Sequence, residues 1–183
     1  MTIVKTCGKL YWAGEYAILE PGQLALIKAI PIYMTAKITA SDTYRLYSDM
    51  FTYGVDMRPD SSYALIQETV ALVEEYLSAQ GVALRPFSLD VRGKMEREGK
   101  KFGLGSSGSV VVLVIKAMLA FYERPAERDL LFKLASAVLL KRGDNGSMGD
   151  IACIVSEDLV LYQSFDREKV AQWLEKEDLP TVL

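Results

Sequence analysis

At residues 103–109 the chain reads Gly103-Leu104-Gly105-Ser106-Ser107-Gly108-Ser109, and an apolar run from Val110 to Ile115 follows at once. The run resumes after Lys116, and its length favours a buried helix although its valines favour a strand. Glycines let a backbone approach a ligand closely, while the free N–H groups and the dipole of a helix N-terminus attract anions. The stretch therefore predicts a phosphate-binding loop, and the alternative is a flexible loop with a serine N-cap.

The serine hydroxyls of this loop could bind phosphate oxygens or a metal ion. The pattern is not a Walker A loop, because no Lys-Ser or Lys-Thr pair follows the glycines. Nor is it a clean G-x-G-x-x-G motif set within a βαβ unit. Lys100 and Lys101 come directly before the loop, and these two cations strengthen the phosphate-binding interpretation.

A second loop holds two acids and a serine among three glycines, with the sequence Gly143-Asp144-Asn145-Gly146-Ser147-Met148-Gly149-Asp150. A carboxylate in such a loop could accept a proton from an attacking oxygen. Asp, Asn, Gly and Ser are also common turn residues, so an ordinary turn is the alternative.

Near the N-terminus, Lys9 is a lone cation inside a strand-like apolar segment that spans residues 7–17. A lysine in a strand usually points to solvent, because lysine is rarely buried without a partner. The alternative is an inward lysine that pairs with an acid or a phosphate.

The composition indicates a globular protein and excludes several kinds of site. Of the 183 residues, 50% are hydrophobic and 25% are charged, which is enough apolar mass for a core. The net charge of -3 lacks the basic excess of nucleic-acid binders. The absence of histidine excludes Ser-His-Asp and Cys-His catalysis and His-containing metal sites. We expect the two cysteines, Cys7 and Cys153, to be reduced and buried.

The N-terminal residues lack the apolar run of a signal peptide, and the run around residues 110–122 is too short to span a membrane. We therefore expect a cytoplasmic protein with no membrane partner.

The alternation and spacing of apolar residues predict an α+β fold, with strands first and helices later. Gly81 suits the C′ position of the first helix, Asp166 suits the N-cap of the last, and Pro31 indicates a strand edge or start. The predicted strands are a hairpin or two short strands in 2–20, a strand over 26–40, a strand pair in 44–53, a strand over 87–91 and two short strands in 151–165. The predicted helices span 61–80, the apolar run around 110–122, 127–142 and 166–176.

These segments, in this order, resemble the GHMP kinases. Gly103-Leu104-Gly105-Ser106-Ser107 matches the family's ATP-phosphate loop, and Gly8-Lys9 through Gly14-Glu15 resembles its first motif. Ser147-Met148-Gly149-Asp150 resembles the segment that carries the family's catalytic aspartate. Within the family, residues 9–16 and 144–150 look most like the bacterial phosphomevalonate kinases.

The resemblance implies that residues 1–183 form a GHMP-kinase N-terminal, ATP-binding domain of the ribosomal protein S5 domain 2-like type. In that fold, helices pack on one side of a mixed sheet. The implied reaction transfers the γ-phosphoryl group of ATP, with Mg²⁺, to phosphomevalonate. The alternatives are another GHMP kinase, such as a mevalonate or homoserine kinase, and a non-catalytic ligand-binding domain of the same fold.

Residue roles follow from the same resemblance. The loop 103–109 would cradle the ATP phosphates, with Ser107 as the Mg²⁺ ligand. Lys9, Lys101 and Asp150 would be the catalytic residues. Lys9 stabilises charge on the transferred group, Lys101 clamps phosphate oxygens, and Asp150 orients Lys9 or the substrate, because a phosphate monoester is already ionised near neutral pH. The predicted contacts with the acceptor substrate are Glu15, Tyr16, Ser147, Met148 and Gly149.

Family members are longer and carry a third glycine-rich motif, which nothing after Asp150 resembles. This favours a shortened chain without the C-terminal domain. We would then expect self-association through the surface that this domain normally covers.

Overall fold

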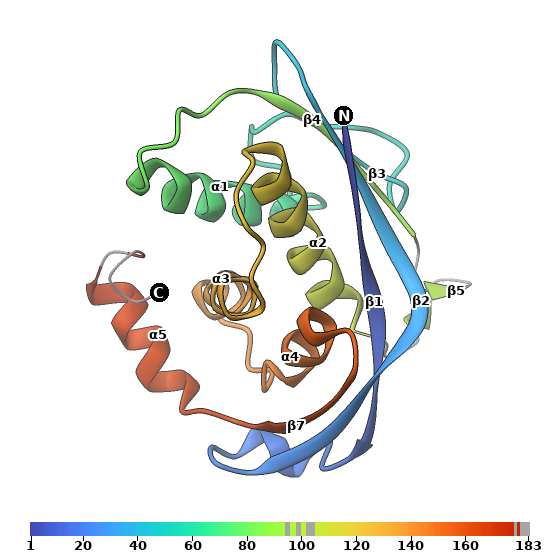
Figure 1. Ribbon diagram of the computed structural model, residues 1–183, viewed down its shortest axis with the longest axis vertical. Coiled ribbons are helices and arrows are strands. Elements are labelled where there is room, and N and C mark those ends of the chain that lie inside the picture. The colour runs from blue at the N-terminus through green and yellow to red at the C-terminus, as the bar shows by residue number, and fades with distance from the viewer. Residues whose placement is uncertain (94–95, 98–99, 102–104, 178, 180–183) are drawn as a thin grey trace.

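The computed structural model describes residues 1–93, 96–97, 100–101, 105–177 and 179. A long curved sheet forms one side of the molecule, and the helices gather on its concave face (Figure 1). The strands are β1 (Thr2–Ala13), β2 (Leu24–Ala40), β3 (Arg45–Ser48), β4 (Phe87–Arg92), β5 (Glu96–Arg97), β6 (Lys100–Lys101) and β7 (Leu159–Gln163). The helices are the 3₁₀ turn η1 (Ala17–Leu19), α1 (Ala64–Ala79), α2 (Ser106–Phe121), α3 (Arg128–Lys141), α4 (Gly149–Ser156) and α5 (Arg167–Lys176).

β2 is the central strand of the main sheet. It pairs with β1 along one side, and along the other side with β7 over Leu24–Lys28 and with β4 over Thr35–Ala40. These pairings are antiparallel, whereas β3 adds to β4 in parallel. The sheet is therefore mixed and the helices lie on one side of it, which confirms the predicted α+β class.

The N-terminal segment differs from its prediction of a hairpin or two short strands, because β1 is one continuous strand. Its register against β2 shifts between Cys7 and Gly8 and lets the strand continue. Pro31 is neither at an edge nor at a strand start but inside β2, opposite this shift. It lies between the stretches of β2 that pair with β7 and β4, so its missing N–H removes no bond to those strands.

Two other strand predictions are wrong. The predicted strand pair in 44–53 reduces to β3, with one isolated bridge from Leu46 to Val55. The first of the two strands predicted in 151–165 is helix α4. Its buried side chains, Ile151, Cys153 and Ile154, fit both a strand and a helix in so short a run, and packing on α2 and the sheet favours the helix.

The remaining helix predictions are confirmed. Gly81 follows α1 with a φ of 72°, and its N–H donates to Ser78 O at 2.9 Å. Asp166 caps α5 by accepting the N–H of Lys169 at 3.1 Å. Both cysteines are free and buried, as expected.

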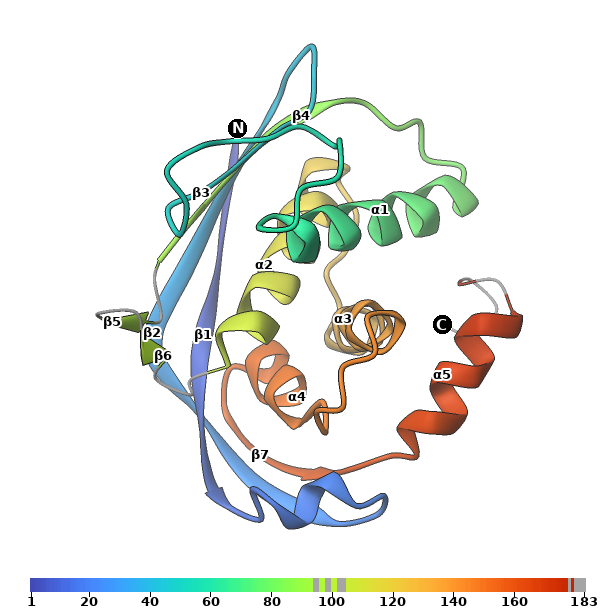
Figure 2. The same ribbon diagram turned by 180° about the vertical axis from the view of Figure 1, so that it is seen from behind.

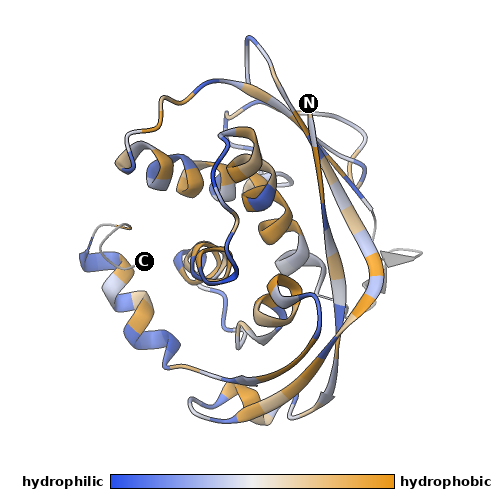
Figure 3. Ribbon diagram, in the orientation of Figure 1, coloured by the Kyte–Doolittle hydropathy of each residue, from blue (hydrophilic) through white to orange (hydrophobic). Residues whose placement is uncertain are grey.

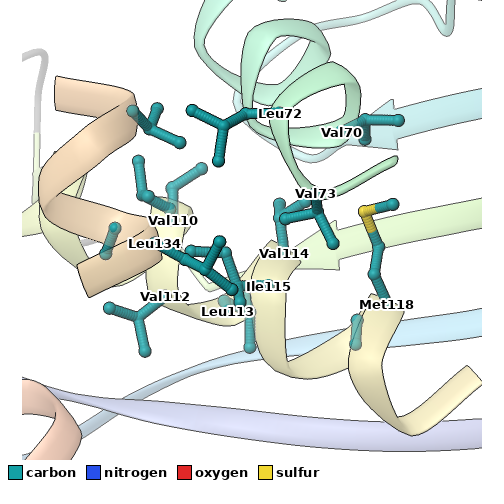
Figure 4. Close-up of a cluster of buried hydrophobic side chains, with 14 of the residues drawn as sticks. Val70, Leu72, Val73, Val110, Val112, Leu113, Val114, Ile115, Met118 and Leu134 are labelled. Carbon is teal, nitrogen blue, oxygen red and sulfur yellow. The ribbon is translucent and has the colours of Figure 1, made fainter. Parts of the chain in front are cut away.

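Helix α2 is the centre of the hydrophobic core. It contacts α1, α3, α4 and the sheet, and 12 of its 16 residues are buried. Figure 4 shows its valines together with Val70 and Val73 of α1 and Leu134 of α3. Figure 3 shows that α5 carries more hydrophilic residues than the helices nearer the sheet, and in Figure 2 α3 lies between α2 and α5. This packing places the N-terminal half of α2 against β1.

In the part of the chain that the structure describes, no helix combines the length and the apolar character needed to cross a membrane.

Candidate active site

Three segments far apart in the sequence meet around Gly105. This residue precedes α2 in the left-handed conformation, with a φ of 79°. A Cβ placed on it would lie 3.0 Å from Cγ and Cε of Lys9 on β1 and 3.6 Å from Cβ of Asp150 on α4. The structure therefore brings together the predicted phosphate loop, the predicted lysine and the predicted aspartate.

The first turn of α2 presents free backbone donors. The N–H of Ser109 donates to Gly105 O at 2.8 Å, so Ser106, Ser107 and Gly108 lie before the first intrahelical bond. No side chain caps this turn among the described residues. Ser107 is exposed and Ser106 is half-buried. The turn can therefore bind an anion through its N–H groups, hydroxyls and dipole.

Ser109 does not fit its predicted role as a phosphate ligand. It is fully buried, and its hydroxyl donates to Cys7 O at 2.9 Å. Its backbone carbonyl accepts the Thr6 hydroxyl at 3.2 Å. Both contacts join α2 to β1, because position 109 faces the sheet rather than the open end of the helix.

A pocket adjoins the exposed side of this turn. Ser106, Ser107 and Val110 form its α2 wall. The opposite wall consists of Ser48, Met50, Phe51, Ser62, Leu65 and Ile66. Such a mix of apolar and hydroxyl side chains suits the uncharged end of a ligand whose phosphates lie at the helix N-terminus.

Lys9 points inward, so the solvent-facing orientation that is usual for a lysine in a strand is wrong here. Its residue is 8% exposed, and its ammonium lies 4.6 Å from the ring centroid of Tyr11. Lys9 and Tyr11 are two positions apart on β1 and therefore share the face toward α2 and α4. The aromatic face stabilises the cation.

Asp150 lies in the first turn of α4 and is half-buried. Its Oδ1 accepts the N–H of Ile151 at 2.9 Å, and a Cβ on Gly108 would lie 2.8 Å from its Oδ2. Burial raises the pKa of Asp150 above its ordinary value, and the Ile151 N–H and the charge of Lys9 oppose this shift in part. The carboxyl is therefore held against α2 beside a lysine.

Side chains from two strands, β1 and β7, contact Ser147 in the loop before α4. Ser147 Oγ lies 3.2 Å from Tyr11 Oη of β1, and the Ser147 carbonyl accepts the hydroxyl of Tyr162 on β7 at 2.7 Å. Gly149 donates its N–H to Ser147 Oγ at 3.2 Å. Met148 is 1% exposed within the core cluster, so its side chain does not fit the predicted contact with substrate.

The other predicted residues are less closely tied to this cluster. Glu15 and Tyr16 are exposed in the turn after β1, and their contacts with substrate stay predictions. Lys101 pairs through its backbone with Glu96 in the β5–β6 ladder, and its side chain lies outside the described part of the structure. Gly103 and Leu104 also lie outside the described residues.

Tyr11 and Tyr162 are the site residues that the sequence analysis missed. Strand alternation could have found Tyr11, because it shares a face with Lys9. No local signal points to Tyr162, since its role depends on the pairing of β7 with β2.

Comparison with known proteins agrees with this geometry. The family model described as GHMP kinases N terminal domain matches residues 64–158. The phosphomevalonate kinase of Streptomyces sp. (strain CL190) is 30% identical over an alignment 189 residues long, which covers 91% of this chain and 50% of that protein.

Solved structures extend the comparison. Streptococcus pneumoniae phosphomevalonate kinase, in complex with phosphomevalonate and AMPPNP, is 73% identical with a TM-score of 0.97 over 100% of this chain and 55% of its own. Methanococcus jannaschii mevalonate kinase, at 20% identity and a TM-score of 0.75 over 94% of this chain and 58% of its own, shares the fold. The chain thus spans about half the length of the relatives that it matches. It belongs to the GHMP kinase family, whose N-terminal domain it carries.

Proposed function

We propose that this chain forms the ATP- and phosphomevalonate-binding part of a phosphomevalonate kinase. Its reaction transfers the γ-phosphoryl group of ATP to the phosphate of phosphomevalonate and gives diphosphomevalonate and ADP. The observation that carries the proposal is the arrangement of Lys9 and Asp150 around Gly105, at the open N-terminus of α2. The likeness to the Streptococcus pneumoniae enzyme supports the choice of acceptor.

The nucleotide phosphates bind at the first turn of α2. The N–H groups of Ser106, Ser107 and Gly108 donate to phosphate oxygens, and the helix dipole favours their negative charge. The adjoining pocket takes the nucleoside. The sequence motif proposed to bind the phosphates also includes Gly103 and Leu104.

Lys9 supplies the positive charge for the transferred group. An oxygen of the acceptor phosphate forms a bond to Pγ, the bond from Pγ to the bridging oxygen breaks, and ADP leaves with that electron pair. Charge spreads over the three remaining oxygens of the γ-phosphoryl group during transfer. The buried ammonium of Lys9 stabilises this charge without reorganising water. We also assign to Lys101, which comes just before the loop in the sequence, the role of clamping phosphate oxygens.

Asp150 orients Lys9 rather than removing a proton. A phosphate monoester has a second pKa near 6, so the acceptor needs no base near neutral pH. The carboxyl lies beside Lys9 at the helix N-terminus, where it holds the ammonium in place.

Ser107 is the protein ligand proposed for Mg²⁺. Its exposed hydroxyl at the start of α2 is a hard oxygen donor, the kind that Mg²⁺ prefers. The described residues hold no group of three acidic, cysteine or histidine side chains suited to a metal, which fits an ion that keeps several waters and nucleotide phosphates as ligands. The bound ion would neutralise phosphate charge.

The acceptor lies on the side of the loop before α4. Ser147 hydrogen-bonds its phosphate, and Gly149, Glu15 and Tyr16 border the same region.

The outer face of the sheet carries exposed apolar side chains, including Trp12 and Leu161, which support self-association. Sedimentation over a range of concentrations tests that part of the proposal, and a monomer at every concentration would contradict it.

Calorimetric titration with Mg·ATP and with phosphomevalonate tests the proposed function, with a turnover assay on the same sample. We expect both ligands to bind, and mevalonate, which lacks the phosphate, to bind far more weakly. Binding of mevalonate or homoserine in preference to phosphomevalonate would indicate a different GHMP kinase. Binding of neither nucleotide nor acceptor would reject the kinase assignment for this chain.

A further inference from the structure

Tyr11 connects the strand that carries Lys9 to the loop that precedes Asp150. Its ring lies under the Lys9 ammonium, and its hydroxyl lies within hydrogen-bonding distance of Ser147 Oγ, 136 positions away in the sequence. One side chain therefore contacts both the cation and the hydroxyl that the proposed function places at the phosphates.

The hydrogen bonds at Ser147 Oγ determine where its proton points. A serine hydroxyl has one donor and two acceptor lone pairs. Gly149 N–H occupies one lone pair. Either hydroxyl could donate in the contact between Tyr11 and Ser147, and the greater acidity of a phenol favours Tyr11 as the donor to the second lone pair. Burial raises the pKa of Tyr11, so its hydroxyl keeps its proton near neutral pH.

We infer that Tyr11 is a positioning residue: by donating to Ser147 Oγ it leaves the Ser147 proton free for a phosphate oxygen of the acceptor substrate. The inference rests on the proposed function and extends it. With both lone pairs occupied, Ser147 can only donate toward substrate. A hydroxyl that can only donate favours an anionic phosphate oxygen, which only accepts. A neutral alcohol is a weaker acceptor and also has a proton of its own to donate.

The surroundings of Tyr11 keep this geometry in place. A Cβ on Gly149 would lie 2.8 Å from Tyr11 Oη, so only glycine allows the approach. Tyr162 holds the Ser147 carbonyl independently of Tyr11. Removal of the Tyr11 hydroxyl alone should therefore leave the fold and the path of the loop intact.

The variant Tyr11→Phe tests the inference, because it removes the hydroxyl and keeps the ring under Lys9. We expect calorimetry to show an affinity for phosphomevalonate lower by about five- to tenfold, the scale of one hydrogen bond, and an unchanged affinity for Mg·ATP. Tyr122→Phe is the matched control. It removes a tyrosine hydroxyl that bonds the backbone of Arg85 beyond the other end of α2, and should change neither affinity.

Two further variants, Ser147→Ala alone and the double variant with Tyr11→Phe, distinguish a positioning role of Tyr11 from a nonspecific loss of structure. If Tyr11 acts through Ser147, the double variant binds phosphomevalonate as weakly as Ser147→Ala alone. Additive losses would overturn the inference, and so would equal losses of both ligands in Tyr11→Phe. An unchanged affinity in Tyr11→Phe would overturn it while the proposed function stands. A wild-type chain that binds no phosphomevalonate would overturn the proposed function, and the inference with it.

Discussion

Atoms of Lys9 and Asp150 lie 3.0 Å and 3.6 Å from the Cβ position of Gly105, although 141 positions separate the two residues in the chain. The lysine comes from a strand and the aspartate from the first turn of a helix, and the glycine has no side chain to keep them apart. The charge of Lys9 lowers the pKa of Asp150, while burial raises it more strongly. This pair of residues defines the chemistry proposed for the site.

The space at Gly105 predicts a loss of nucleotide binding in Gly105→Ala. The left-handed φ of 79° costs an alanine about 1–2 kcal/mol of stability, and the new Cβ also presses on Lys9. We expect the affinity for Mg·ATP to fall at least about tenfold, roughly 1.4 kcal/mol, when measured by calorimetry.

Gly81→Ala is the control for that experiment. Gly81 has a similar φ of 72°, and nothing lies within 4 Å of its Cβ position. It should lose a similar free energy of unfolding in urea and keep its affinity for Mg·ATP. Equal nucleotide affinity in the two variants would show that the contact with Lys9 has no part in binding.

Ser107 and Ser109 should behave in opposite ways when replaced by alanine. Ser109→Ala removes the bond to Cys7 O inside the core, and the free energy of unfolding should fall by about 1–2 kcal/mol with little change in Mg·ATP affinity. Ser107→Ala should leave stability within about 0.5 kcal/mol and weaken Mg·ATP binding. Urea denaturation and calorimetry measure both effects. A loss of nucleotide affinity in Ser109→Ala without loss of stability would restore its predicted role as a ligand.

The raised pKa of Asp150 predicts a cost in stability. The folded chain holds the Asp150 proton more tightly than the unfolded chain. The free energy of unfolding therefore decreases as the pH rises from the ordinary carboxyl value, near 3.9, through the raised value. Asp150→Asn lacks this titration, so its stability relative to wild type should increase over that window and then level off. Urea denaturation at a series of pH values measures the difference. An Asn variant whose stability relative to wild type falls over that window would show that the charge of Lys9 outweighs burial.

The roles of Lys9 and Asp150 in turnover should also differ. If Asp150 orients rather than removes a proton, Asp150→Asn lowers kcat by less than about tenfold, or roughly 1.4 kcal/mol. Lys9→Met removes the charge that stabilises the transferred group and should cost far more. Steady-state assays that compare kcat of the two variants with that of the wild type, in a catalytically active form of the protein, distinguish the two roles. Normal turnover in Lys9→Met would reject the assignment of the site.

The core around α2 predicts a large effect of one truncated side chain. Leu113 is fully buried, so Leu113→Ala should lower the free energy of unfolding by about 2–5 kcal/mol. Leu161→Ala is the control, because Leu161 is 70% exposed and its loss should change stability by less than about 0.5 kcal/mol. Denaturant titration compares the two, and similar losses would contradict the packing of α2.

Local pattern predicts most of the regular elements correctly. The spacing of apolar residues predicts α1, and the length of the apolar run predicts α2. The cap residues Gly81 and Asp166 mark helix ends where the structure has them. The eight residues of α4 are too few for this, because Ile151, Cys153 and Ile154 fit both periods. Only packing against the neighbouring elements favours the helix there.

The motif residues show the same division. Gly105 and Asp150 occupy the positions that their motifs predict, next to Lys9. Ser109 and Met148 belong to the same motifs, yet both side chains turn into the core. A motif specifies residue types along the chain, whereas the rotation of each helix on the sheet selects the side chains that reach the site.

The sequence by itself determined where α2 begins, which residues cap α1 and α5, and that a lysine and an aspartate accompany the glycine loop. The first two features depend on neighbours within a few positions, whereas the third follows from the family motifs along the chain. The tertiary structure alone decided that Lys9 points inward and that Tyr11 meets Ser147. Ser147 lies 136 positions from Tyr11 in the chain. Both features follow from the pairing of β1 with β2 and the packing of α2 and α4 on β1, which no local spacing encodes.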